Sequence, residues 1–269
     1  MRAIIFSKDR PAQLDLLLNS ILKNFNGLFA SVVVLYKATA SEFDQGYDLI
    51  FELHQQTLMI PQQGFFNDTK QILDSHWSHV AFLTDDDLFY RPFRYVPYPQ
   101  EALDADPDLL TVSLRLGGNT TYCYPMRCEQ MTPSGTEVSG DMLKYIWRSG
   151  QWDFGYPASL DGNVWRRDDL QELLWGKEFS NPNELEDVLV KATKSARQKL
   201  TGIYQESCLV NIPANIVNTT HRNRHGETYP FTAYDLNREF LNGKRLSLGG
   251  MDLSNIDAAH CERQLVFNY

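Results

Sequence analysis

The segment Val80-Ala81-Phe82-Leu83-Thr84-Asp85-Asp86-Asp87 places three consecutive carboxylates directly after an apolar run. A short apolar run of this kind predicts a buried strand, here over residues 79–83, that ends at the acidic residues. Like charges a few Å apart resist joint ionisation unless a positive group lies between them. Mg²⁺ and Mn²⁺ prefer such oxygen ligands and commonly bridge them to a phosphate. The alternative is a solvated acidic turn, because Asp favours turns.

Short apolar runs and helical patterns alternate before this segment. Strands are predicted over residues 3–7, 31–36 and 58–60, and helices from Pro11 onward and over residues 41–53 and 65–77. Pro suits the first turn of a helix. This order predicts the α/β class, with a mostly parallel sheet covered by helices on both faces. Ligands bind such sheets beyond the carboxyl ends of the strands, so we expect a site where residues 7–10, 36–37, 61–63 and 85–87 meet.

The pattern changes after Pro92. A strand is predicted over residues 109–116, helices over 168–174 and from Pro182 to about Leu200, and a strand over 208–212. Residues 117–140 are rich in Thr, Ser and Gly and show no periodicity. Such a length is unusual for a structureless loop within a compact domain and favours a functional or mobile segment. The last thirty residues carry little pattern, and no role is predicted for them.

Composition narrows the classes of function. The chain has 269 residues, 43% of them hydrophobic, which is typical of a globular protein with a full core. Its net charge of −9 argues against broad nucleic-acid binding. No stretch approaches the roughly 20 apolar residues of a membrane span. The N-terminal apolar run is too short for a signal peptide, so we expect a cytoplasmic protein whose fold starts at the first residue. The four cysteines lack metal-ligand spacing and are interpreted as reduced thiols without a role.

Basic and polar residues near the strand ends are candidates for binding an anionic ligand. Ser7, Arg10 and Lys37 follow predicted strands, and Arg10 suits a phosphate or the face of a base. Asn67 and Lys70 are three residues apart and therefore share one face of a predicted helix. For each of these residues alone, a solvated surface position is an equal alternative.

The segment from Trp152 to Asn163 combines aromatic residues with turn formers. Aromatic rings cover the C–H faces of sugars while carboxylates bind hydroxyls, so Trp152, Asp161 and Gly162 are candidates for binding a substrate. The alternative is that the aromatic residues pack in the core.

Two further clusters carry possible chemistry. Residues 181–187 predict a helix start that also brings together Glu184, Glu186 and Asp187, of which one could accept a proton. In residues 221–226, His221 or His225 could complete a metal shell. The alternatives are an ordinary helix cap and an exposed polar loop.

Together these segments resemble the GT-A fold of nucleotide-sugar-dependent glycosyltransferases, in its family-2-like or exostosin-like branch. The resemblance rests on residues 4–10, on residues 82–87 and on Glu184-Leu185-Glu186-Asp187. It identifies the acidic run as the DxD motif, with Asp87 as the main metal ligand and Asp85 and Asp86 in support. It also implies that the Glu-Asp pair lies near the acceptor and a late His near the diphosphate. Lys8-Asp9-Arg10 departs from the Tyr-Asn-Arg type of many members.

The sequence therefore predicts a glycosyltransferase dependent on Mn²⁺ or Mg²⁺. Residues 1–116 would bind the nucleotide-sugar donor, with a UDP-sugar first among candidates, and residues 117–269 would bind a glycan or small-molecule acceptor within the same domain. Glu184, Glu186 and Asp187 are the catalytic candidates, and both inverting and retaining outcomes stay open. Two alternatives are a catalytically inactive carbohydrate- or partner-binding relative and a nucleotidyltransferase, although the latter usually has a Gly-rich loop that residues 7–11 lack.

Overall fold

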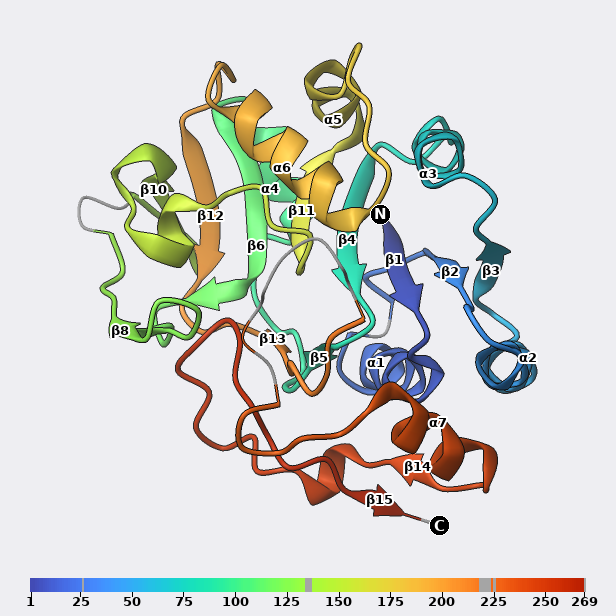
Figure 1. Ribbon diagram of the computed structural model, residues 1–269. Helices are drawn as coiled ribbons and strands as arrows, with labels where there is room; N and C mark the ends of the chain where they lie inside the picture. Colours follow the sequence, from blue (N-terminus) through green and yellow to red (C-terminus); the bar gives the residue numbers. More distant parts are fainter. Residues whose placement is uncertain (26, 134–136, 218–223, 225, 269) are drawn as a thin grey trace.

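A nine-stranded sheet forms the centre of the computed structural model (Figure 1), which describes residues 1–25, 27–133, 137–217, 224 and 226–268. In order across the sheet the strands are β3 (Leu58–Pro61), β2 (Ser31–Lys37), β1 (Arg2–Lys8), β4 (His79–Thr84), β11 (Asn163–Arg166), β6 (Leu109–Gly117), β12 (Leu200–Tyr204), β10 (Met142–Ile146) and β9 (Glu137–Ser139). β1 is parallel to β2 and β4, and β2 to β3. β11 is antiparallel to β4 and β6, so these two share one direction. The predicted α/β class with a mostly parallel sheet is confirmed.

Within the part of the chain that the structure describes, three two-stranded sheets flank this centre. They are β5 (Asp87–Phe89) with β13 (Leu209–Asn211), β7 (Tyr122–Cys123) with β8 (Cys128–Glu129), and β14 (Arg245–Leu246) with β15 (Phe267–Asn268). The antiparallel pairing of β5 with β13 sets Asn211 opposite Asp87. A residue of the second half of the chain is thereby fixed against the acidic run.

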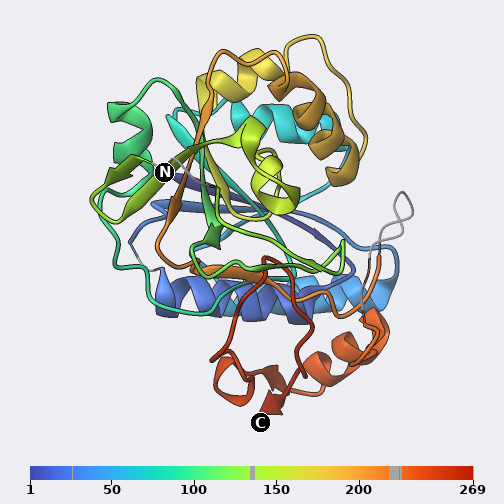
Figure 2. The same ribbon diagram turned by 90° about the vertical axis from the view of Figure 1, so that its left-hand side faces the viewer.

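Helices cover both faces of the sheet. They are α1 (Pro11–Asn24), α2 (Ser41–Leu53), α3 (Phe65–Leu73), α4 (Pro99–Ala105), α5 (Arg167–Leu173), α6 (Pro182–Thr193) and α7 (Ala233–Leu241), with 3₁₀ turns at η1 (Trp147–Ser149), η2 (Trp152–Gly155) and η3 (Leu248–Gly250). Successive residues of β1 alternate between the faces: Ala3 and Ile5 pack with α1, α2 and α7, while Ile4 and Phe6 pack with α3, α5 and α6. Figure 2 shows α1 below the sheet and the helices α3, α5 and α6 above it.

The predicted elements of the first half match the observed ones closely, but three expectations are corrected. The helix predicted over residues 65–77 ends at Leu73. The helix predicted from Pro182 to about Leu200 ends at Thr193, because Leu200 starts the buried strand β12, which packs between β6 and β10. Residues 163–166, of which Asn163 was interpreted as the end of a turn-rich segment and the others were given no element, form the central strand β11. The sequence pattern of β11 and of β12 indicates a strand only weakly, and both form strands because they are buried between neighbouring strands of the sheet.

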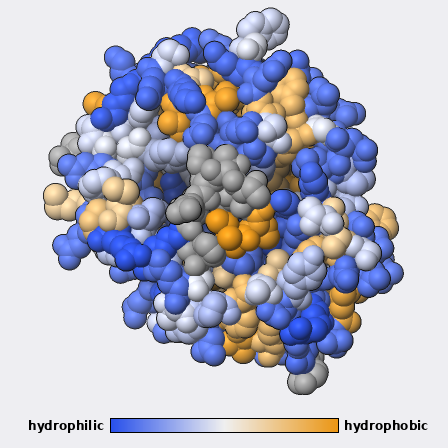
Figure 3. Space-filling view, in the orientation of Figure 1, coloured by the Kyte–Doolittle hydropathy of each residue, from blue (hydrophilic) through white to orange (hydrophobic). Residues whose placement is uncertain are grey.

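Residues 1–116 and 117–269 contribute strands to one continuous sheet, with β11 inserted between β4 and β6. Within the described residues, no helix is long and apolar enough to cross a membrane. The face seen in Figure 3 is mostly hydrophilic, with apolar side chains in separate groups. The carboxyl ends of β1, β2 and β4 meet at one edge of the sheet, where the sequence predicts a site.

Candidate active site

A cleft of about 850 Å³ opens at this edge of the sheet. One end is lined by residues at or just after the carboxyl ends of the parallel strands: Ser7, Lys8, Arg10, Lys37, Gln62, Asp85 and Asp86. The other end is lined by Arg115 of β6 and by residues of the second half, among them Tyr124, Met126, Arg127, Trp152, Tyr156, Asp161, Glu186 and His260. The cleft therefore offers a mixed-charge end beside an aromatic and acidic end.

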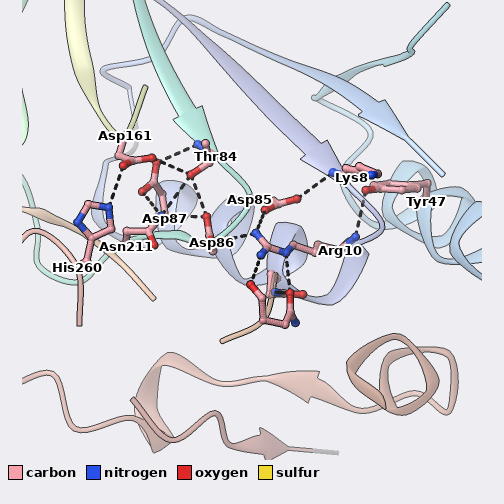
Figure 4. Close-up of polar contacts among 12 residues, drawn as sticks. Lys8, Arg10, Tyr47, Thr84, Asp85, Asp86, Asp87, Asp161, Asn211 and His260 are labelled. Carbon is pink, nitrogen blue, oxygen red and sulfur yellow. Dashed lines mark hydrogen bonds and ion pairs between the residues drawn. The ribbon is translucent and has the colours of Figure 1, made fainter. Parts of the chain in front are cut away.

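Arg10 neutralises the acidic run at the first end (Figure 4). It lies between β1 and α1, and its Nη1 donates to Asp85 Oδ1 and Asp86 Oδ2, each at 2.9 Å. Its Nε donates to Asn215 Oδ1 at 2.7 Å, and its Nη2 to the carbonyl of Asn215. Arg10 is 8% exposed. Although burial opposes its charge, Asp86 and Asp85 raise the pKa of Arg10. The guanidinium group therefore binds the protein's own carboxylates and Asn215, and it is not free to bind a ligand.

Asp85 is the more enclosed of the two carboxylates that Arg10 contacts. Its Oδ2 accepts from the backbone N–H of Lys8 at 3.1 Å. Burial raises the pKa of Asp85 to about 6, against the opposing effect of Arg10. Tyr47 supports the same strand end, because its hydroxyl lies 2.7 Å from Ser7 Oγ and accepts from the Arg10 N–H at 3.3 Å.

Asp87 is turned away from the cleft. Its Oδ2 accepts from the backbone N–H of Thr84 at 3.0 Å, its Oδ1 accepts from Asn211 Nδ2 at 3.2 Å, and it is 2% exposed. Burial, with Asp161 and Asp86 nearby, raises the pKa of Asp87. Asp87 therefore closes the turn between β4 and β5, whereas Asp85 and Asp86 line the cleft.

Asp161 and His260 form an ion pair beside the acidic run. His260 Nε2 lies 3.2 Å from Asp161 Oδ2, and Asp161 Oδ1 accepts from the hydroxyl of Thr84 at 3.0 Å. Burial opposes ionisation of Asp161, but the hydrogen bond and charge of His260, together with Arg115 and Thr84, outweigh burial and lower the pKa of Asp161 to about 2. Burial likewise opposes protonation of His260, and Asp161 raises its pKa. The pair therefore favours the carboxylate and the imidazolium.

Glu186 has the opposite electrostatic setting to Asp161. It lies on α6, and its Oε1 accepts from the backbone N–H of Leu160 at 3.1 Å. Burial and the charge of Asp161 raise the pKa of Glu186 to about 7. Neighbouring carboxylates whose pKa values are driven apart are typical of acid–base sites.

The other predicted catalytic carboxylates do not line the cleft. Glu184 Oε2 accepts from the N–H and the hydroxyl of Ser180, both at 2.8 Å, and Asn181 caps α6 by accepting from the Glu184 N–H. Glu184 is thus used to start the helix. Asp187 also lies outside the described lining. Of the three residues, only Glu186 faces the cleft.

The predicted ligand-binding residues divide in the same way. Ser7, Lys37 and Trp152 line the cleft. Asn67 and Lys70 do share a face of α3, but it is the solvent-exposed face, while the opposite face packs on the sheet. Gly162 is required for another reason: it has φ +76°, and a Cβ there would come within 2.2 Å of Leu209.

The residues of this cleft that could hold a metal ion are the carboxylates of the acidic run. Within the described residues, no group of three or more His, Cys, Asp or Glu side chains is placed to hold a metal. His221 and His225 lie outside the described residues. A Mg²⁺ ion carried by a diphosphate commonly takes only one or two protein carboxylates. Asp86, with 12% of its side chain exposed against 4% for Asp85, is the carboxylate best placed for that role.

Several lining residues had no distinct signal in the sequence. Arg115 is an exception, because a charged residue within the otherwise uncharged strand β6 was a usable sign; it is 2% exposed, and its Nη1 lies 3.5 Å from Asp153 Oδ1. Asn211 and Asn215 are ordinary loop or strand residues by type. His260 belongs to the unpatterned C-terminal segment, and only the tertiary course of that segment brings it to Asp161.

Comparisons with known proteins give limited similarity. The chain matches no protein-family model and no curated protein. Among solved structures, it is similar to Staphylococcus aureus TarS at 16% identity and a TM-score of 0.46, over 79% of this chain and 37% of that one. It is similar to TarS 1–349 in complex with UDP at 12% identity and a TM-score of 0.44, over 78% and 59%. It is similar to a mycobacterial protein at 12% identity and a TM-score of 0.41, over 76% of this chain and 64% of that one. The chain thus spans less than two thirds of each of these, and the likeness is confined to the general course of the fold.

Proposed function

We propose that this chain is a GT-A-type glycosyltransferase, which transfers a sugar from a nucleotide diphosphate-sugar to an acceptor hydroxyl. The observation that carries the proposal is that the acidic run, at the carboxyl end of β4, and Glu186 line one and the same cleft. The positions of Ser7, Lys8 and Lys37 suit a nucleotide, because ligands of parallel sheets bind beyond the strand ends. A UDP-sugar is the first donor to test.

Glu186 is the base in this proposal. A carboxylate with a pKa of about 7 accepts a proton efficiently near neutral pH. It would take the proton of the acceptor hydroxyl while that oxygen attacks the anomeric carbon and the bond to the diphosphate breaks. Such a displacement inverts the configuration of the sugar. Asp161, held ionised by His260, stays a fixed negative charge that keeps the proton affinity of Glu186 high.

A divalent cation, Mn²⁺ or Mg²⁺, is proposed to accompany the diphosphate next to Asp86. When bound, it would stabilise charge on the departing diphosphate. The acceptor, a glycan or a small molecule with a free hydroxyl, would lie at the aromatic end, where Trp152 is 46% exposed and Tyr156 also lines the cleft.

Calorimetric titration of UDP, with and without Mn²⁺, tests the donor site. We expect Mn²⁺-dependent binding by the wild type, binding at least 10-fold weaker in Asp86→Ala, and unchanged binding in Asp168→Ala, whose side chain is 79% exposed on α5. If UDP binds equally well with and without Mn²⁺, the proposed cation is refuted and the proposed donor site is supported. No binding of UDP or of other nucleoside diphosphates by the folded protein would refute the donor site.

A further inference from the structure

Two of the four cysteines face each other across the small sheet β7–β8. Cys123 and Cys128 are register partners in this antiparallel pair. Thr121 and Gln130 lie opposite each other two positions from the cysteines, toward the open end of the sheet. The N–H of Gln130 donates to the carbonyl of Thr121 at 2.8 Å, so these two residues form a hydrogen-bonded pair. Because hydrogen-bonded and non-hydrogen-bonded pairs alternate, the Cys123 and Cys128 position is also of the hydrogen-bonded kind, with Cα atoms about 5.5 Å apart. That separation lies within the range of disulfides.

The two thiols differ in environment. Cys123 is 2% exposed, and burial together with Asp153 raises its pKa to about 11. Cys128 is only partly buried. Cys128 is therefore the thiol that an oxidant in solution reaches first, and Cys123 is placed beside it to resolve the product. Cys208 and Cys261 are both buried and belong to the hydrophobic core.

The turn that joins the two cysteines forms part of the cleft wall. The N–H of Arg127 donates to the carbonyl of Tyr124 at 3.3 Å, and Arg127 has φ +56°, a conformation that few residues other than Gly adopt. Tyr124, Met126 and Arg127 all line the cleft. A covalent bond across the base of this turn would restrain the backbone that carries these side chains, whatever ligand the cleft holds.

We propose that Cys123 and Cys128 form a reversible disulfide that staples the 124–127 turn at the rim of the cleft. The oxidant is a low-molecular-weight disulfide such as glutathione disulfide. The Cys128 thiolate attacks one of its sulfurs and releases one glutathione thiolate. The Cys123 thiolate then attacks Cys128 Sγ and releases the second. The two protons lost by the cysteines protonate the two leaving thiolates, so two protein thiols and one disulfide give one protein disulfide and two thiols.

Reversibility follows from the register. Opposed Cβ atoms are about 4.5–5.5 Å apart in antiparallel pairs, at the wider end for hydrogen-bonded pairs. The Cβ atoms of a relaxed disulfide are closer, at about 3.5–4.5 Å. The strands must therefore shift slightly when the bond forms, and a bond under such tension is more easily reduced than a relaxed one.

Thiol mapping of the full-length protein tests the proposal. The protein is equilibrated with glutathione and glutathione disulfide at graded ratios, denatured, and alkylated with N-ethylmaleimide. We expect the oxidised wild type to take up two alkyl groups in place of four. Trypsin cuts after Arg127, so a non-reducing digest should show residues 116–127 joined to residues 128–144, and dithiothreitol should separate them.

Two variants complete the test. Cys261→Ser should keep the link between the two peptides, and Cys128→Ser should lose it. Four alkylated cysteines at every ratio, a link that involves Cys208 or Cys261, or glutathione that stays attached to Cys128 would each overturn the proposal. The wild-type peptide map decides the question even if a variant fails to fold.

Discussion

The two ends of the cleft hold buried carboxylates in different ways. At the end formed by the strand ends, Asp85 and Asp86 are compensated by Arg10, which stays charged at any ordinary pH. At the other end, Asp161 is compensated by His260, whose charge depends on pH, and Glu186 has no ion-pair partner within the described residues. The first arrangement suits a fixed binding surface, whereas the second suits proton transfer.

This difference predicts how each end responds to a change of one side chain. Removing a permanent buried cation leaves uncompensated charge, which is costly to the folded state. Neutralising a carboxylate that is already close to half protonated at neutral pH costs the fold little but removes its proton-accepting form. Damage at the first end should therefore appear in stability and damage at the second end in rate.

Arg10→Met should give the largest effect. It leaves Asp85 and Asp86 buried without a cation and Asn215 without its donor, so we expect a loss of about 3–5 kcal/mol in the free energy of unfolding. Arg238→Met is the matched control, because that side chain is 65% exposed and its ion pairs are worth at most about 1 kcal/mol. Urea denaturation of both variants measures the difference. Equal stability of the two would show that Arg10 does not compensate the acidic run.

Glu186→Gln should leave stability within about 1 kcal/mol of the wild type and reduce transfer about 10²–10⁴-fold, the usual contribution of a general base. The amide keeps the shape of the side chain and cannot accept the proton. In the wild type, kcat/KM should fall as the pH drops through about 7, because Glu186 is then protonated. The measurement is the pH profile of transfer from a UDP-sugar to an acceptor.

Glu184→Gln is the control for this prediction, since Glu184 lies on the same helix and bonds to Ser180 but does not itself line the cleft. We expect its transfer rate to stay within a few-fold of the wild type. If Glu184→Gln loses as much activity as Glu186→Gln, the start of α6 rather than one carboxylate matters, and the assignment of the base fails.

The contrast between the two ends also explains what the sequence could and could not predict. The first end depends on local patterns: apolar strands, helices that begin at Pro11 or Ser41, and charged residues that directly follow a strand. Position along a parallel strand fixes which edge of the sheet a residue reaches, so Arg10, Asp85 and Asp86 were found from the sequence. Whether each of these side chains faces the cleft was harder to predict from the sequence, because the turn after Thr84 directs Asp87 into the protein.

The second end depends on contacts between distant segments. Thr84 and Asp161 are 77 residues apart, and Asp161 and His260 are 99 apart. No periodicity encodes such pairs. Helical spacing correctly put Asn67 and Lys70 on one face of α3 but could not say whether that face looks toward the sheet or toward solvent. The same limit applied to residues 184–187, where only packing singles out Glu186.

His260→Gln should give the smallest effect and should separate the titratable end from the permanent one. Asp161 raises the pKa of His260 in the folded protein above its unfolded value. The pair therefore contributes its full stability below the unfolded pKa of about 6.5 and loses it as the pH rises through the folded pKa. We expect wild type and variant to differ by about 1 kcal/mol in the free energy of unfolding at acidic pH and to converge at alkaline pH. The Arg10→Met loss should instead persist at alkaline pH, because the guanidinium does not titrate there. A difference between wild type and His260→Gln that is constant with pH would mean that His260 acts by packing alone, and that both ends of the cleft hold their carboxylates by fixed contacts.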